Sequence, residues 1–175
     1  EALVLRSDVR RKQLAGLPPS TRARAEFGTG LYTPEAIDHT YQVLLDEAIT
    51  ALERGRSVVV DATFSDPRHR RLFLDAAVRL NHPASLLYID ASDETIRARL
   101  ALRAHETGEA SDANESVYEH ALESFSTPDD VHPALRIDVR PDEAPDTIVA
   151  RILDHFARDV SRIEEGRDPA AIEPR

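Results

Sequence analysis

The sequence contains no cysteine, and this absence excludes disulfide bonds and thiolate metal sites. It also lacks an apolar run long enough to span a membrane and shows no signal-peptide pattern, so no membrane partner is expected. These features fit a cytoplasmic protein. Aromatic residues make up only 5% of the chain and do not alternate with basic residues, which leaves a base-stacking surface for nucleic acid without support.

Several motifs of common enzyme classes are absent as well. The seven histidines show no metal-ligand spacing, and no Gly-x-Ser-x-Gly string supports a serine hydrolase. The formal net charge of −10 argues against a broad nucleic-acid surface, although a local basic cleft could coexist with it. At 175 residues the chain is expected to form one domain over residues 1–160, followed by a charged tail or linker at 161–175.

Two apolar runs that each lead to an aspartate are the most informative feature that the chain does have. Leu3–Leu5 precede Asp8, and Val58–Val60 precede Asp61. Continuous Val and Leu runs are typical of strands in a parallel sheet that helices cover on both faces, and ligands of such sheets bind beyond the carboxyl ends of the strands. Both aspartates should therefore lie at one sheet edge. Basic residues follow each one, which suggests phosphate and magnesium chemistry: Arg10, Arg11, Lys12, Arg68, Arg70 and Arg71.

Strands and helices are predicted to alternate along the chain. Thr33, Pro34 and Glu35 are typical of a helix start, and Gly55 of its end. This alternation predicts an α/β fold with a parallel sheet and right-handed crossovers. The strands are expected at residues 2–5, 57–62, 85–89 and 135–139, and the helices at 9–15, 34–54, 66–80, 93–104, 114–125 and 145–160.

The segment around Asp8 allows two interpretations. A carboxylate just past a strand can take a proton from a substrate hydroxyl, and Arg11, three residues on, can hold a polar or anionic substrate group. Alternatively, Ser7 or Asp8 caps a short helix, and both interpretations can hold together. Asp61 similarly fits the Walker-B position, which holds magnesium, or a simple turn after a strand.

Two arginines fall on the expected inward face of a later helix. Arg99 and Arg103 share a helical stripe with Ile96 and Leu100. Such a position predicts pairing with a buried anion or a place over a phosphate site, and the alternative is an ion pair with a neighbouring acid. The polar segment after Arg103, at about 104–125, has the composition of a lid.

Taken in order, Leu5–Lys12, Val58–Phe64 and Arg99-x-x-x-Arg103 resemble the small P-loop kinases, in particular the AAA-type ATP-binding group. That group is related to polynucleotide, gluconate and chloramphenicol kinases and is often fused to an aminoglycoside-phosphotransferase-like domain. The resemblance covers about residues 3–156 and implies a three-layer P-loop NTPase-like fold. No G-x-x-x-x-G-K-[ST] string occurs in the chain, so the first strand, the P-loop and the first helix of the family are expected to precede Glu1.

The resemblance also implies roles for single residues. On the acceptor side, Asp8 would activate the hydroxyl that receives the phosphoryl group, and Arg11 and Arg6 would bind the acceptor. The family's cofactors are ATP and Mg²⁺. On the nucleotide side, Asp61 would hold magnesium through water, beside Thr63.

The two lid arginines, Arg99 and Arg103, would brace the transferring phosphoryl group, with Arg99 also contacting the nucleotide. These roles predict an ATP-dependent phosphotransferase that acts on a hydroxyl of a small molecule. Two alternatives stay open: a nucleotide-binding module without turnover in a fused protein, and a kinase of 5′-hydroxyl ends of nucleic acid.

Overall fold

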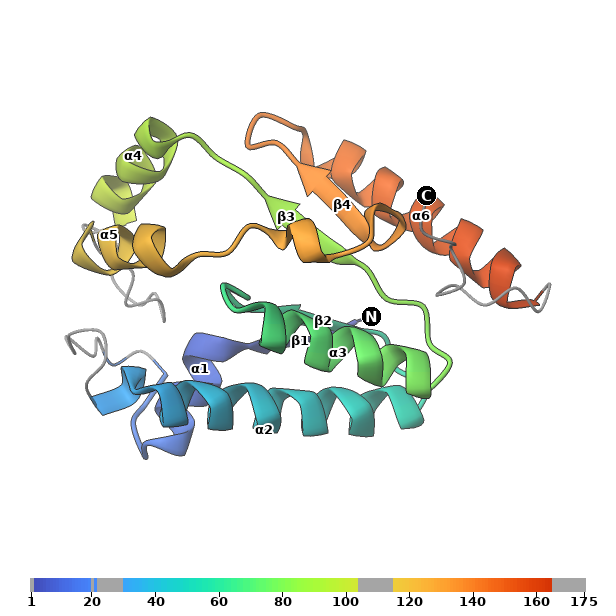
Figure 1. The fold of residues 1–175 in the computed structure, drawn as a ribbon, viewed down its shortest axis with the longest axis horizontal. Coiled ribbons are helices and arrows are strands. Elements are labelled where there is room, and N and C mark those ends of the chain that lie inside the picture. Colours follow the sequence, from blue (N-terminus) through green and yellow to red (C-terminus); the bar gives the residue numbers. More distant parts are fainter. Residues whose placement is uncertain (1, 20, 22–29, 104–114, 165–175) are drawn as a thin grey trace. The chain divides into compact units, whose positions relative to one another are not determined.

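The computed structural model describes residues 2–19, 21, 30–103 and 115–164. Helices and strands alternate as predicted (Figure 1). The segment at 104–114, the first half of the predicted lid, lies outside the described residues. The elements are β1 (Leu3–Arg6), α1 (Ser7–Leu14), η1 (Gly30–Tyr32), α2 (Pro34–Glu53), β2 (Val58–Asp61), α3 (Pro67–Arg79), β3 (Leu86–Ile89), α4 (Asp93–Arg103), α5 (Glu115–Ser124), η2 (Pro128–Asp130), η3 (Pro133–Leu135), β4 (Arg136–Val139) and α6 (Pro145–Glu164).

All four strands pair in parallel, which confirms the predicted fold class. The described strands form two sheets of two, β1–β2 and β3–β4, where the sequence suggested one sheet. The ladder hydrogen bonds of β2 go to β1 and those of β3 go to β4, so β2 and β3 are not neighbours in a ladder. By their contacts the residues group into two compact units, Glu1–Phe73 with Ser92–Thr127 and Leu74–Ala91 with Pro128–Arg175.

Helix α2 is the main support of the first unit, and its ends follow the prediction. The Thr33 hydroxyl accepts a hydrogen bond from the Ala36 amide at 3.2 Å, and Pro34 is the first helical residue. Gly55, just beyond the helix, has φ +72°, a left-handed conformation that suits glycine. Figure 1 shows α2 running along the β1–β2 sheet.

The core of the first unit lies between α2, α3 and one face of this sheet. On the opposite face Val4 and Val59 are 56% and 50% exposed. Within this unit, α2 and α3 contribute to the same core cluster. That cluster comprises Leu5, Leu44 and Ala48, with Leu3, Val58, Val60 and Phe73 packed against it.

The second unit buries Ile137 and Val139 of β4. Helix α6 is tied to this strand because the Arg151 guanidinium donates to the Asp138 carbonyl oxygen at 2.9 Å. The helix runs to Glu164, past its predicted end near residue 160, because the added residues are compatible with a helix. Among the helices in the described part of the chain, none has the length and apolarity to cross a membrane.

Candidate functional site

The carboxyl ends of β1 and β2 bring the two predicted aspartates to one sheet edge. Arg6, the last residue of β1, is opposite Asp61, the last residue of β2. The chain enters α1 directly after Arg6, so Asp8 lies in the first turn of that helix. The expectation that both acids follow parallel strands at the same edge is confirmed by this register.

Arg6 and Asp61 pair across the two strand ends. The Arg6 Nε lies 3.3 Å from the Asp61 carboxylate, and the two side chains are 39% and 62% exposed. An ion pair this open to water contributes little to stability. The Asp61 carboxylate therefore stays accessible to a ligand or a cation from solvent.

Asp8 pairs along its own helix with Arg11. An Nη of Arg11 lies 3.3 Å from the Asp8 carboxylate. The Arg11 side chain is only 14% exposed and that of Asp8 29%. The guanidinium also lies over the Tyr32 ring, 4.8 Å from its centre, a cation–π geometry. The buried Arg11 Nε has no hydrogen-bond partner among the described residues, so this group keeps one donor unused.

The helix-cap interpretation of Ser7 and Asp8 is wrong. Helix α1 begins at Ser7, its N-cap is Arg6, and no side chain makes the capping hydrogen bond. The strand runs straight into the helix, which leaves no room for a separate cap at Ser7 or Asp8. Asp8 is instead an acid in the first helical turn, where the helix dipole favours its charge.

Tyr41 of α2 contacts the turn that follows β2. Its ring is buried, and its hydroxyl accepts a hydrogen bond from the Phe64 amide at 2.9 Å and lies 3.5 Å from the Thr63 hydroxyl. Burial raises the pKa of the Tyr41 hydroxyl, and the charges of Arg11 and Asp8 also act on it, in opposite directions. The hydroxyl is thus hydrogen-bonded to the turn after β2 and lies within the electrostatic influence of Asp8 and Arg11.

His69 of α3 stacks on the Tyr41 ring. The two rings stack with centres 3.8 Å apart and planes 11° apart. The His69 Nε2 lies 2.8 Å from the Asp38 carboxylate of α2, so the imidazole is held between two side chains of that helix. The stack fixes the position of the tyrosine hydroxyl.

The turn after β2 ends at Asp66, as predicted. The Asp66 carboxylate accepts from the Arg68 amide at 2.8 Å and from the Arg68 guanidinium at 2.7 Å, which lowers the pKa of Asp66. Within the turn, Phe64 has φ +45°, in the left-handed region that a side chain disfavours. This strained residue follows Thr63 directly.

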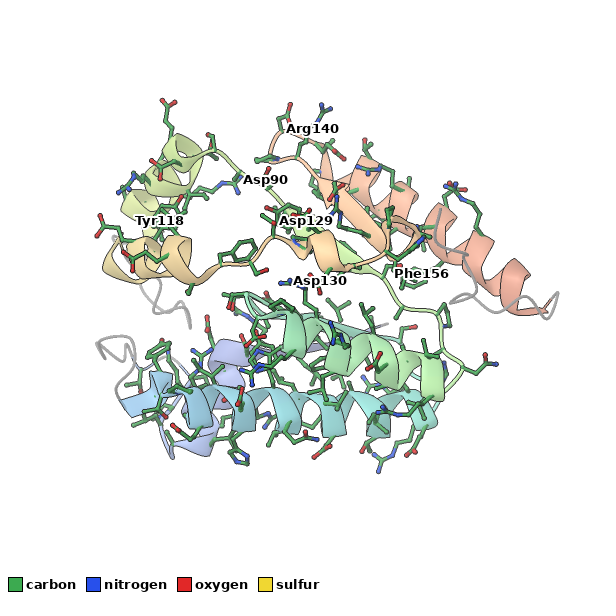
Figure 2. The ribbon with its side chains drawn as sticks, in the orientation of Figure 1. Asp90, Tyr118, Asp129, Asp130, Arg140 and Phe156 are labelled. Carbon is green, nitrogen blue, oxygen red and sulfur yellow. The ribbon has the colours of Figure 1, made fainter. Side chains whose placement is uncertain are left out.

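The predicted inward position of Arg99 is wrong, because its side chain is exposed on α4. Arg97 faces α5 instead: its guanidinium lies 5.5 Å from the centre of the Tyr118 ring and 3.9 Å from the Glu119 carboxylate, and it also pairs with Asp93 of its own helix at 2.9 Å. Tyr118 of α5 is labelled in Figure 2. Residues 97 and 99 are about 200° apart around a helix, so a helix that turns one toward its neighbour turns the other outward. The side chain of Arg103 lies outside the described residues.

The side chains at this sheet edge can be compared with the ligands that magnesium requires. Among the described residues no group of three or more histidine, cysteine or acidic side chains could hold a metal by itself. Magnesium in phosphoryl-transfer sites, however, is usually bound by one or two carboxylates together with substrate phosphates and water. A single exposed carboxylate such as Asp61 fits that shared arrangement.

Parallel strands joined by helical crossovers, with Asp61 at the end of β2 and Asp8 in the helical turn after β1, form an α/β fold. Residues 1–128 match the family model described as AAA domain, and the chain belongs to this family. A gluconokinase from Sinorhizobium meliloti has a similar structure, with a TM-score of 0.60 and 14% sequence identity over 94% of this chain and 82% of that one. None of the curated proteins matches. The chain thus has a kinase-like P-loop fold.

Sequence reasoning missed the residues that hold this edge together. The sequence patterns assign no role to Tyr41, Tyr32 or His69. Tyr41 could have been singled out, because a tyrosine on the buried face of a helix usually needs a hydrogen-bond partner for its hydroxyl. Which partner it finds depends on a turn more than twenty residues away in the chain.

Proposed function

We propose that this chain belongs to an ATP-dependent phosphotransferase that moves the γ-phosphoryl group of ATP to a hydroxyl of a small molecule. The observation that carries this proposal is the placement of Asp8 and Asp61 at one edge of a parallel sheet, each beside an arginine. The membership of the AAA domain family and the kinase-like fold support it.

Asp8 is proposed as the general base on the acceptor side. The acceptor oxygen attacks the γ-phosphorus, its proton passes to the Asp8 carboxylate, and the bond to the leaving ADP oxygen breaks. Arg11 is placed to hold a polar or anionic group of the acceptor, since it lies beside Asp8 and has an unused buried Nε donor. Arg6 lies next to this pair in the chain and could add a further contact.

Asp61 and Thr63 are proposed to serve the nucleotide side. The exposed Asp61 carboxylate would hold magnesium through water, and the ion would offset the charge of the ATP phosphates. Arg99 and Arg103 would contact the transferring group from α4. The exposed position of Arg99 leaves it available to an anionic ligand.

The sequence holds no G-x-x-x-x-G-K-[ST] string. A loop of that kind supplies several charge-assisted hydrogen bonds to the phosphates, at about 1.5–3 kcal/mol each. Because this chain lacks those contacts, calorimetry should find only millimolar MgATP affinity for it. Micromolar binding by the chain itself would contradict the dependence on that loop.

The phosphotransferase function is tested by measuring ADP formation with the full-length gene product. Gluconate, other sugar acids, polyols and a 5′-hydroxyl oligonucleotide serve as acceptors. We expect ADP release to rise well above the acceptor-free rate with at least one small acceptor, with a phosphorylated product. Tight MgATP binding without acceptor-dependent ADP would instead indicate a binding module, and salt-sensitive turnover of the oligonucleotide alone would indicate a nucleic-acid kinase.

A further inference from the structure

Arg70 of α3 is a buried arginine that binds backbone carbonyl groups from two separate segments. Only 2% of the residue is exposed. Its Nη1 donates to the carbonyl oxygen of Phe64 at 2.6 Å, of Ser126 at 3.0 Å and, more weakly, of Ser65 at 3.4 Å. Its Nη2 donates to the Thr127 carbonyl oxygen at 3.3 Å. One guanidinium thus joins the turn after β2 to the segment after α5.

A backbone hydrogen bond reinforces this connection. The Ser126 amide donates to the Ser65 carbonyl oxygen at 3.1 Å. Both segments belong to the same compact unit, so these contacts lie within one body of the structure. The planar guanidinium suits this task because its donors diverge in a fixed fork, whereas a lysine ammonium acts as a point charge.

The Phe64 peptide is held from both sides. Its N–H donates to the Tyr41 hydroxyl at 2.9 Å, and its C=O accepts from Arg70 at 2.6 Å. A residue other than glycine with positive φ is strained and persists only where its surroundings hold it. Because Phe64 follows Asp61 and Thr63 in one short turn, the contacts that hold it also fix the path of the chain beyond Asp61.

We propose that Arg70 is a positioning residue for the nucleotide side of the site. It maintains the strained turn that carries Asp61 and Thr63, and it links that turn to the segment that follows α5. The structural part of this inference depends only on the contacts around Phe64. Its catalytic consequence rests on the phosphotransferase function proposed above.

Amide hydrogen exchange on Arg70→Lys and Arg70→Gln tests the structural part, with Arg79→Ala as control. Arg79 is an exposed arginine in the last turn of the same helix. We expect exchange at the amides of Phe64 and Ser126 to rise roughly tenfold in both Arg70 variants, because they lose charge-assisted hydrogen bonds to carbonyl groups. Exchange within α1 and in the Arg79 variant should match the wild type. Wild-type protection of both amides in folded Arg70→Lys would overturn the inference.

Steady-state kinetics on the full-length gene product test the catalytic consequence of the Arg70 contacts. We expect KM for MgATP to rise roughly tenfold in Arg70→Lys while KM for the acceptor stays unchanged, since the Asp8 side is held separately. Guanidinium ion at millimolar concentration should partly restore Arg70→Ala. Equal changes in both KM values would contradict the positioning role. An inactive wild type with altered exchange in the variants would instead refute the phosphotransferase function and leave the structural link intact.

Discussion

The turns that follow β1 and β2 carry one predicted aspartate each, but they are held in different ways. After β1 the chain enters α1 at once, and Asp8 finds its partner Arg11 one helical turn along. After β2 the chain stays irregular until Pro67, and Phe64 is held by side chains from two other helices. The first turn is stabilised by local contacts and the second by tertiary ones.

This difference has a consequence for how each turn responds to change. Contacts within one helix survive as long as the helix forms, whereas contacts from separate helices require the core to be intact. Damage to the core should therefore disturb the Asp61 turn before the Asp8 turn. The following predictions test that contrast, from the largest expected effect to the smallest.

Leu44→Ala should give the largest loss of stability. Leu44 is completely buried in the cluster that packs on both strands, and truncation of such a leucine costs about 2–5 kcal/mol. Urea unfolding measures the change. Leu122→Ala is the control, because that side chain is 53% exposed and its loss should change the free energy of unfolding by no more than about 0.5 kcal/mol. Equal losses in the two variants would mean that the core is misplaced.

Tyr41→Phe should weaken only the second turn. The change removes the hydroxyl that accepts from the Phe64 amide and should lower the free energy of unfolding by about 0.5–1.5 kcal/mol. Hydrogen exchange should show faster exchange at Phe64 with unchanged protection within α1. Tyr88→Phe, a change in the second unit, is the matched control. Loss of protection in α1 as well would contradict the separate support of the two turns.

Stability should also fall at alkaline pH through Tyr41. Burial raises the pKa of its hydroxyl above that in the unfolded chain, so the folded state holds the proton more tightly. The contribution of this proton to the free energy of unfolding is fully present below the unfolded pKa of about 10. It is lost as the pH rises through the higher folded pKa. Urea midpoints from pH 8 upward should decline more steeply for the wild type than for Tyr41→Phe. Parallel curves would show that this hydroxyl is not buried.

The Arg10–Glu47 pair should contribute least. The two side chains approach to 2.6 Å between α1 and α2, but they are 30% and 32% exposed. A double-mutant cycle with alanine at both positions should give a coupling of at most about 1 kcal/mol, reduced by salt. A larger, salt-independent coupling would mean that the Asp8 turn depends on tertiary contacts after all.

The parts of the site that could be predicted from sequence are those with local signals. The apolar runs fixed the strand ends closely enough to place Asp8 and Asp61 at one edge, and Thr33, Gly55 and Asp66 marked helix ends through familiar capping chemistry. The spacing of Asp8 and Arg11 also matches a contact along one helix.

The remaining features depend on contacts between distant segments. No pattern in the sequence indicates that Tyr41 meets Phe64 or that Arg70 reaches Ser126. The prediction that Arg99 faces inward was wrong for a related reason. Periodicity gives the faces of a helix, but the partner decides which face turns inward, and here α5 meets α4 at Arg97.

The most direct test of the account compares Asp8→Asn with Asp61→Asn in the full-length gene product. Asp8→Asn should lower turnover about 10²–10⁴-fold and leave MgATP binding unchanged, because asparagine keeps the shape but cannot take the proton. Asp61→Asn should weaken magnesium-dependent ATP binding, and Asp46→Asn, an exposed acid of α2, should change neither. An Asp8→Asn protein with full turnover would contradict the proposed division of roles between the two aspartates.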